Sequence, residues 1–195
     1  MNFLAHLYLS GNQDHIVIGN FIADHIKGRQ IDQVGKDVLK GVHMHRAIDD
    51  YTDHHPIILQ TKERLRPTQG KYSPVVADVF MDHFWAIKFE QFCPTPLVIF
   101  ADNVFKLLKA NEQVLPVRTQ NMLVYMQKDN WLTAYRTLEG MDFILKAMSR
   151  RTNFPSNMAV AASDLERDYL LYEKDYEMFF PQLQSFCKDY LENIG

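Results

Sequence analysis

Proline and glycine divide this chain into intervals of helical length, and no other feature of the sequence constrains its fold more. Both residues disfavour a helix interior, because proline lacks an amide hydrogen and glycine loses the most backbone freedom on folding. The dividing residues are Pro56, Pro67, Gly70, Pro94, Pro116, Gly140 and Pro155. Between them, apolar residues recur every three or four positions, so we predict a chain of helices separated at these points.

The clearest predicted helix is SPVVADVFMDHFWAIKFEQF, residues 73–92. Ser73 followed by Pro74 is typical of a helix start, because serine caps the first turn and proline fits the first helical position. The same reasoning predicts helices that begin at Thr95-Pro96 and at Pro116, and helices that cover residues 140–151 and 156–180.

The rest of the sequence favours one all-α unit. No run of alternating residues is joined to another by a two-residue hairpin, so we do not expect a sheet. A chain of 195 residues with 47% apolar content can bury a sizeable core and has the usual length of one domain. We therefore predict a single-domain helical bundle over residues 1–195.

Charge and composition exclude several classes of protein. A formal net charge of −3 does not indicate a nucleic-acid-binding protein, since such domains are usually basic. The opening MNFLAHLYLSG has no basic region typical of a signal peptide, and no apolar run approaches the roughly 20 residues that span a membrane. Cys93 and Cys187 form no ligand spacing, which favours reduced thiols and a cytoplasmic protein.

The histidines are distributed very unevenly. All eight lie in the first 83 residues: His6, His15, His25, His43, His45, His54, His55 and His83. Residues 41–56, GVHMHRAIDDYTDHHP, hold four of them together with three aspartates. Imidazole and carboxylate are ligands that suit manganese, iron, zinc or magnesium, so this density indicates a site for a divalent ion.

Helical spacing groups some of these residues on one face. His45, Asp49 and Asp53 follow one another at steps of four, which places their side chains about one helical turn apart. His43 is two residues from His45 and would point away from it. The two histidines can share an ion only if the helix begins irregularly near Gly41.

Other candidates stand out because their surroundings are apolar. Asp82 and His83 lie in VVADVFMDHFWAI, where a carboxylate is costly to bury unless it is paired or binds a metal. The same argument applies to His6, between Ala5 and Leu7, and to Asp24, which follows an apolar segment. A structural salt bridge remains the alternative for these residues.

Histidines and aspartates that project inward from several helices could hold one or two divalent ions. Such ions activate water and neutralise phosphoryl charge, so the pattern favours hydrolysis of a phosphoester. The sequence has no Walker A loop, no dinucleotide-binding glycine motif and no GxSxG elbow, which argues against the nucleotide-loop and serine-hydrolase classes.

Several of these segments also resemble a known family. NFLAHL, GNFIADHIKG, KGVHMHRAIDDYTDHHP, VVADVFMDHFW and NWLTAYRTLEGMDFILKAMSRR look like the acyl carrier protein phosphodiesterases, in the same order and with similar spacing. The resemblance implies an all-helical, HD-phosphohydrolase-like fold that uses manganese or, as alternatives, magnesium, iron or zinc. It also implies an activity in lipid metabolism: removal of 4′-phosphopantetheine from holo acyl carrier protein of fatty acid biosynthesis, by metal-activated water.

The resemblance further implies roles for individual residues. We expect Asp24, His43, Asp82, His83 and His6 to bind the metal. His45 and Asp49 are expected to be catalytic, with Asp49 or Asp53 orienting a histidine. Arg46 is expected to clamp a phosphate oxygen, and its alternative is a salt bridge to Asp49 or Asp50.

A carrier protein is strongly acidic, so an enzyme that acts on it needs a basic docking surface. The candidates are Lys62, Arg64, Arg66, Lys71, Arg150 and Arg151. As an alternative, the basic residues of the segment TKERLRPTQGK would only keep a helix soluble.

The sequence is also compatible with two other functions. One is an HD-type phosphohydrolase that acts on nucleotides or other small phosphoesters, which shares every argument for a metal. The other is a non-catalytic helical module that binds a carrier protein, in which the histidines and aspartates are structural.

Overall fold

The computed structural model describes residues 2–194, except the side chains of residues 29, 32 and 33. All regular structure in this part of the chain is helical. The α-helices are α1 (Phe3–Leu9), α2 (Asp14–Ile22), α3 (Lys36–His54), α4 (Pro56–Gln69), α5 (Ser73–Phe92), α6 (Leu97–Ala110), α7 (Val117–Lys128), α8 (Trp131–Ala134), α9 (Leu138–Ser149), α10 (Ala162–Arg167) and α11 (Tyr169–Ile194). The predicted all-α fold class is confirmed. None of these helices combines the length and the apolar character needed to cross a membrane.

The prolines correctly predicted where three of the helices begin. Helix α5 begins at Ser73 with Pro74 in its first turn, although the N-cap position belongs to Tyr72. Helices α6 and α7 each begin directly after a proline, Pro96 and Pro116 respectively. Proline suits these positions, because the first amides of a helix have no partner within it.

Three predicted boundaries were wrong. Pro67 lies inside the last turn of α4, and Gly140 lies in the first turn of α9, where its amide donates to the Thr137 hydroxyl at 3.0 Å. The stretch 156–180 is not one helix, because it is interrupted at Asp168 between α10 and α11. Proline and glycine are tolerated in terminal turns, where fewer helical hydrogen bonds depend on them.

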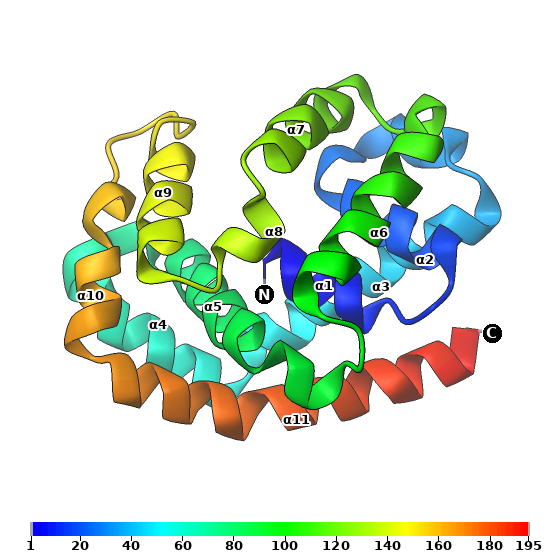
Figure 1. Ribbon diagram of the computed structural model, residues 1–195. Coiled ribbons are helices and arrows are strands. Elements are labelled where there is room, and N and C mark those ends of the chain that lie inside the picture. Colours follow the sequence, from blue (N-terminus) through cyan, green and yellow to red (C-terminus); the bar gives the residue numbers. More distant parts are fainter. Residues whose placement is uncertain (1, 195) are drawn as a thin grey trace.

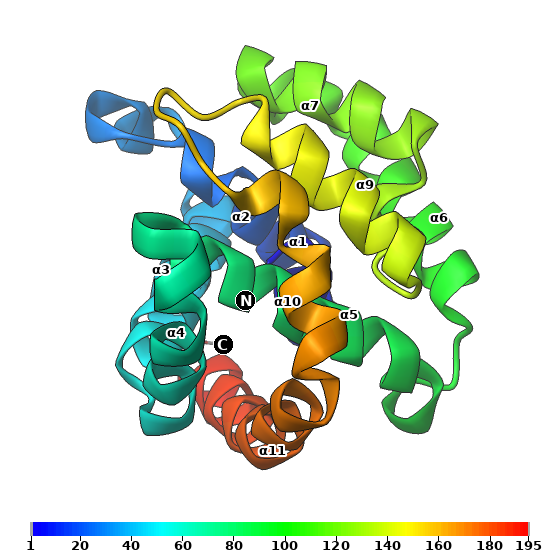
Figure 2. The same cartoon turned by 90° about the vertical axis from the view of Figure 1, so that its left-hand side faces the viewer.

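Helix α5 runs through the interior and is buried on most sides (Figure 1). Trp85 of α5 stacks on Phe180 of α11, with ring centroids 4.3 Å apart. Helix α11 spans the lower side of the molecule in both views, and α7 lies on the opposite side (Figures 1 and 2). This aromatic contact helps to hold α5 and α11 together in the core.

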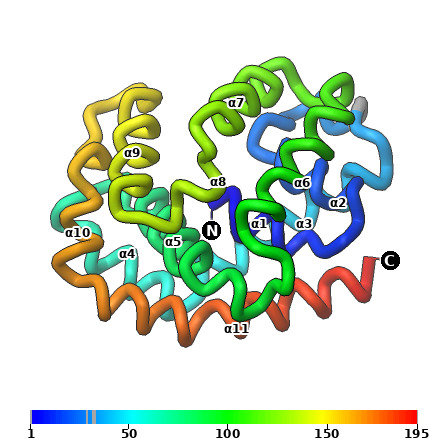
Figure 3. The backbone as a smooth tube through the Cα atoms, viewed as in Figure 1, coloured from blue at the N-terminus to red at the C-terminus, as the bar shows by residue number. Residues whose placement is uncertain are grey.

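The short helix α1 lies in the middle of the molecule, as the tube in Figure 3 shows. Leu4 and Ala5 are completely buried, and Leu7 is nearly so. A seven-residue helix is too short to be stable alone, so packing against its neighbours must maintain it. This position carries His6 into the interior.

Helices α2 and α3 touch backbone to backbone at Gly19 and Gly41. A Cβ atom on Gly19 would lie 1.9 Å from the Val38 carbonyl oxygen, and one on Gly41 would lie 2.3 Å from that of Ile16. Only glycine permits this approach. Asn20 follows directly after the contact on α2, and His45 lies one turn beyond it on α3.

Candidate metal centre

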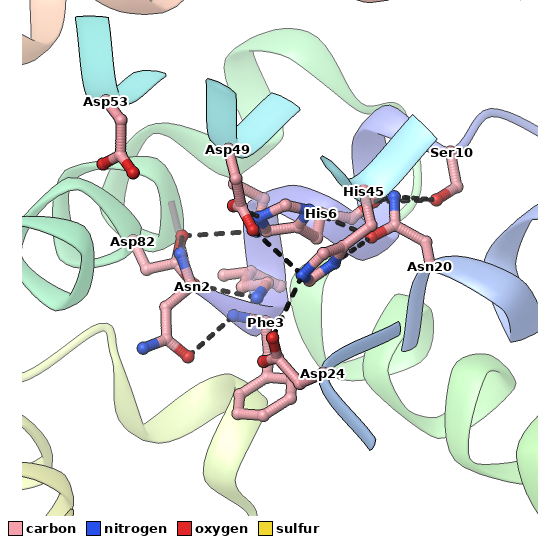
Figure 4. A network of polar contacts seen from close by, with 12 residues as sticks. Asn2, Phe3, His6, Ser10, Asn20, Asp24, His45, Asp49, Asp53 and Asp82 are labelled. Atoms are coloured by element: carbon pink, nitrogen blue, oxygen red, sulfur yellow. Dashed lines mark hydrogen bonds and ion pairs between the residues drawn. The ribbon is translucent and has the colours of Figure 1, made fainter. Parts of the chain in front are cut away.

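The rings of His6 and His45 lie face to face, with centroids 4.2 Å apart and planes inclined by 27°. His6 comes from α1 and His45 from α3, and Asn20 of α2 joins them (Figure 4). The Nδ1 atoms of His6 and His45 donate to Asn20 Oδ1 at 2.9 and 2.8 Å. Three helices therefore meet at a single amide oxygen.

The orientation of Asn20 follows from its other contacts. Its Nδ2 donates to the His6 carbonyl oxygen at 3.1 Å and to Ser10 Oγ at 2.9 Å, so Oδ1 faces the two rings. An amide oxygen only accepts hydrogen bonds, which requires a hydrogen on each Nδ1. In the neutral rings, the free lone pair therefore belongs to Nε2.

Both Nε2 atoms point toward the carboxylate of Asp49. The distances are 3.1 Å from His6 Nε2 to Oδ1 and 3.1 Å from His45 Nε2 to Oδ2. The potential ligand atoms of His6, His45 and Asp49 all lie within 4.8 Å of one another. Asp24 Oδ1 lies 3.4 Å from His45 Nε2. Two imidazoles and a carboxylate are a donor set that fits a divalent transition-metal ion.

The pKa values show how closely these groups interact. Burial opposes protonation of His45, but the carboxylates of Asp24 and Asp49 raise its pKa to about 9. Burial and the charge of His45 lower the pKa of His6 to about 4. Burial would raise the pKa of Asp49, yet the two imidazoles hold it well below its usual range. At neutral pH, His45 therefore carries a hydrogen on both ring nitrogens, while His6 is neutral and keeps only its Nδ1 hydrogen.

A cavity of about 360 Å³ opens beside this cluster. Polar and apolar side chains line it together, and the polar ones extend beyond the cluster. The further polar residues are Asn2, Thr52, Asp53 and Asp78, and the apolar ones are Phe3, Leu7, Phe21, Pro74, Val75 and Met148. The arrangement provides space for a substrate with one charged end and one apolar part.

A family model described as acyl carrier protein phosphodiesterase matches residues 1–183. The chain belongs to this family. The resemblance noted in the sequence is thereby confirmed.

Individual relatives of the family are similar along nearly their whole length. The acyl carrier protein phosphodiesterase of Pectobacterium atrosepticum is 30% identical over 189 residues, covering 96% of this chain and 98% of that protein. The one from Escherichia coli O157:H7 is 31% identical over 192 residues, covering 95% and 96%. The one from Photorhabdus laumondii is 29% identical over 186 residues, covering 95% and 94%. No solved structure gives a match to the chain.

Asp82, which was expected to bind the metal, lies at the start of α1 instead of in the cluster. Its carboxylate accepts backbone N–H groups of Asn2, Leu4 and Ala5 at 3.2, 2.8 and 3.4 Å. These are first-turn amides that a helix cannot satisfy internally, so Asp82 caps α1. Burial raises its pKa to about 7, against the effect of the three amides. The structure does not bring Asp82 into the cluster.

His83 and His43 also lie apart from the cluster. The two nitrogens of His83 contact the Tyr135 carbonyl oxygen at 2.7 Å and the Tyr169 hydroxyl at 3.2 Å. His43 is exposed, on the face of α3 that points away from His45. The helix is regular through Gly41, so the irregular start that would unite the two histidines does not occur.

Two expected residues on α3 have other partners. Arg46 is exposed, and its Nη2 donates to the Ile26 carbonyl oxygen at 3.4 Å instead of forming an ion pair. Asp53 lines the cavity and accepts a hydrogen bond from Lys62 Nζ at 2.7 Å. In the described part of the chain, neither residue contacts a histidine of the cluster.

The expected docking residues divide into two kinds. Lys62 pairs with Asp53, Arg64 with Asp175 at 2.6 Å, and Arg66 with Glu63 at 3.0 Å. The remaining ones meet aromatic rings or solvent: Lys71 lies 3.7 Å from the ring centre of Phe154, Arg151 lies 5.5 Å from that of Trp131, and Arg150 is exposed. Most of the charge on α4 is therefore neutralised locally.

Asn20 lies four residues before Asp24, but sequence reasoning assigned it no role in the cluster. It is only 1% exposed, within the apolar segment IVIGNFI. A buried amide among apolar residues must find partners, as a buried carboxylate must. The argument that selected Asp82 and His6 applies equally to Asn20.

Proposed function

We propose that this protein hydrolyses the phosphodiester that links 4′-phosphopantetheine to the serine of holo acyl carrier protein. The products are the apo carrier protein and 4′-phosphopantetheine. The observation that carries the proposal is the convergence of His6, His45 and Asp49 on one cavity in a member of the acyl carrier protein phosphodiesterase family. The family match does not favour a nucleotide phosphohydrolase or a non-catalytic module.

The donor set supports a divalent ion at this site. His6 Nε2, His45 Nε2 and an oxygen of Asp49 would hold it, with Asp24 beside them as a further ligand. Nitrogen and oxygen donors suit manganese, which we propose as the natural ion, and also iron, zinc or magnesium. When bound, such an ion supplies Lewis acidity, which activates water and neutralises charge on the phosphoryl group.

The chain itself supplies orientation. Asn20 fixes both rings through their Nδ1 hydrogens, so both Nε2 lone pairs face the cavity. Asp49 approaches both rings and is partly exposed to the cavity, with 42% of its side chain accessible. Asp24, with 66% of its side chain accessible, is the more exposed of the two carboxylates, and it would accept a proton from an attacking water.

The apolar residues that line the cavity support the choice of substrate. Phe3, Phe21, Val75 and Met148 line it together with the charged groups. In 4′-phosphopantetheine, a phosphate is joined to a long arm that begins with a branched apolar segment. A cavity lined by both charged and apolar residues would bind the phosphate at the cluster and the arm beside it.

A direct test is conversion of holo carrier protein to the apo form by the purified protein, with manganese added. Gel mobility and mass spectrometry of the carrier would measure the product. We expect conversion by the unaltered protein and by His43→Ala, and none by His45→Ala. Absence of apo product with manganese, magnesium, iron and zinc would refute the proposal.

A further inference from the structure

The surface beside Asp24 carries exposed cations that the proposed chemistry does not use. Lys27, Arg46 and Arg118 are all exposed. In the described structure, none of the three forms an ion pair, whereas Lys62, Arg64 and Arg66 all do. Their positive charge is therefore available to a partner.

Contacts between three elements bring these cations together. His25 of the 3₁₀ helix η1 (Ala23–His25) contacts Thr119 Oγ1 of α7 through its Nδ1, at 2.7 Å. Arg118 is the neighbour of Thr119, and Lys27 follows His25 by two residues. Burial and the charges of Arg118 and Lys27 lower the pKa of His25, whereas the carboxylate of Asp24 raises it, so these charged groups all act on His25.

Arg46 completes the group from α3. Its guanidinium donates to the Ile26 carbonyl oxygen, between His25 and Lys27. We call Lys27, Arg46 and Arg118 the basic rim.

The basic rim is connected directly to the candidate metal centre. Arg46 is the neighbour of His45 on α3, and Lys27 follows Asp24 by three residues. A partner bound to the rim would therefore meet the same two segments that supply the cluster. Asp24 lies on this side of the cluster and is largely exposed.

We propose that the basic rim is the docking surface for the acidic carrier protein, an inference that rests on the proposed function. The chain has a formal net charge of −3, so it repels an acidic protein overall and must attract it through a local patch. The rim combines three cations that form no ion pair with any described side chain and a direct connection to the cluster. The basic segment of α4 lacks the first property, because its charges are paired.

The test is binding of fluorescently labelled apo carrier protein, which carries no bond to be hydrolysed, measured by anisotropy. The variant Lys27→Glu/Arg118→Glu reverses two charges of the rim. We expect its Kd to rise by about tenfold or more in dilute buffer, and the difference to shrink as salt screens the charges. The KM for holo carrier protein should rise more than kcat falls.

The matched control is Lys174→Glu/Lys188→Glu, which makes the same change in net charge on α11. Lys174 and Lys188 are exposed, and α11 lies across the molecule from α7 (Figures 1 and 2). We expect less than about a twofold change in its Kd, since long-range charge effects are weak once screened. Circular dichroism of both variants should match that of the unaltered protein.

The outcomes separate this inference from the proposed function. Equal losses of binding in both variants, or none in the rim variant, would overturn docking at the rim even if the enzyme hydrolyses holo carrier protein. Rim-dependent binding of the carrier without any hydrolysis would support docking and overturn the proposed function instead.

Discussion

Two histidine-aspartate groups of similar appearance in the sequence have different structural surroundings. In the cluster of His6, His45 and Asp49, the polar atoms contact other side chains, and the Nε2 atoms of the two rings face a cavity. In the pair Asp82 and His83 on α5, most polar atoms meet backbone groups, because Asp82 caps α1 and His83 contacts the Tyr135 carbonyl oxygen. Burial alone therefore does not distinguish a candidate active site from a structural cap.

The two groups differ in which of their polar atoms can still bind a ligand. The amides of α1 occupy the Asp82 carboxylate, whereas Asn20 occupies only the Nδ1 side of each ring in the cluster. The Nε2 side stays directed at the cavity.

The largest effect is expected from Asp49→Asn and from His45→Ala. Asp49→Asn removes the negative charge of one ligand and His45→Ala removes an imidazole ligand, so kcat/KM for holo carrier protein should fall by about a hundred- to a thousandfold. Steady-state kinetics and metal analysis would measure the loss of turnover and of bound metal. A variant that keeps normal turnover would exclude its residue from the centre.

Asp82→Ala is expected to act on stability instead. Loss of the cap leaves the buried amides of Leu4 and Ala5 and the part-buried amide of Asn2 without this acceptor, so the free energy of unfolding should fall by about 2–4 kcal/mol. Urea denaturation would measure this, and the kcat/KM of the folded protein should stay within about threefold because Asp82 is outside the cluster. Loss of activity at unchanged stability would return Asp82 to the metal ligands.

Asn20→Leu should weaken metal binding without removing a ligand. The two rings would lose the acceptor that fixes their orientation, and affinity should fall by about ten- to a hundredfold. Calorimetry with manganese would measure it. Ser10→Ala, which removes a partner of Asn20 but leaves both rings in place, is the matched control and should change affinity much less.

Metal affinity should depend on pH, because the ion must displace the proton of His45. The His45 pKa is raised to about 9, so this proton is bound at neutral pH and absent above pH 9. Affinity should therefore fall by about tenfold for each pH unit below 9, with release of roughly one proton per ion. Calorimetry in buffers of different ionisation enthalpy would count the protons, and affinity independent of pH would contradict the assignment.

The smallest effect is expected for His43→Ala. His43 is exposed on the face of α3 opposite His45, so turnover, metal content and stability should all stay within about twofold. A large loss of metal in this variant would show that the cluster is incomplete without His43.

Much of the fold follows from local sequence signals. The starts of α5, α6 and α7 could be predicted because proline acts on its own first turn. The relation between His45 and Asp49 was equally local, since residues four apart on a helix share a face. The break at Asp168 and the passage of α11 through Pro181 could not be predicted, because packing against other helices outweighs local preference there.

The partners of the buried polar groups could not be predicted from spacing. Asp82 receives its hydrogen bonds from residues 77 to 80 positions away, and Asn20 joins His6 to His45 across 14 and 25 positions. A motif shows that a buried carboxylate or imidazole needs a partner. It does not show whether the partner is a helix terminus or a ligand.

The contact between Gly19 and Gly41 makes the candidate centre sensitive to two positions that carry no functional group. A single methyl group at either position would collide with main-chain oxygen atoms and force α2 and α3 apart. This displacement would separate Asn20 from the His45 ring, although every ligand residue would still be present. A comparison of relatives by their histidines and aspartates alone would therefore accept, as able to form the centre, some chains in which α2 and α3 cannot pack this closely.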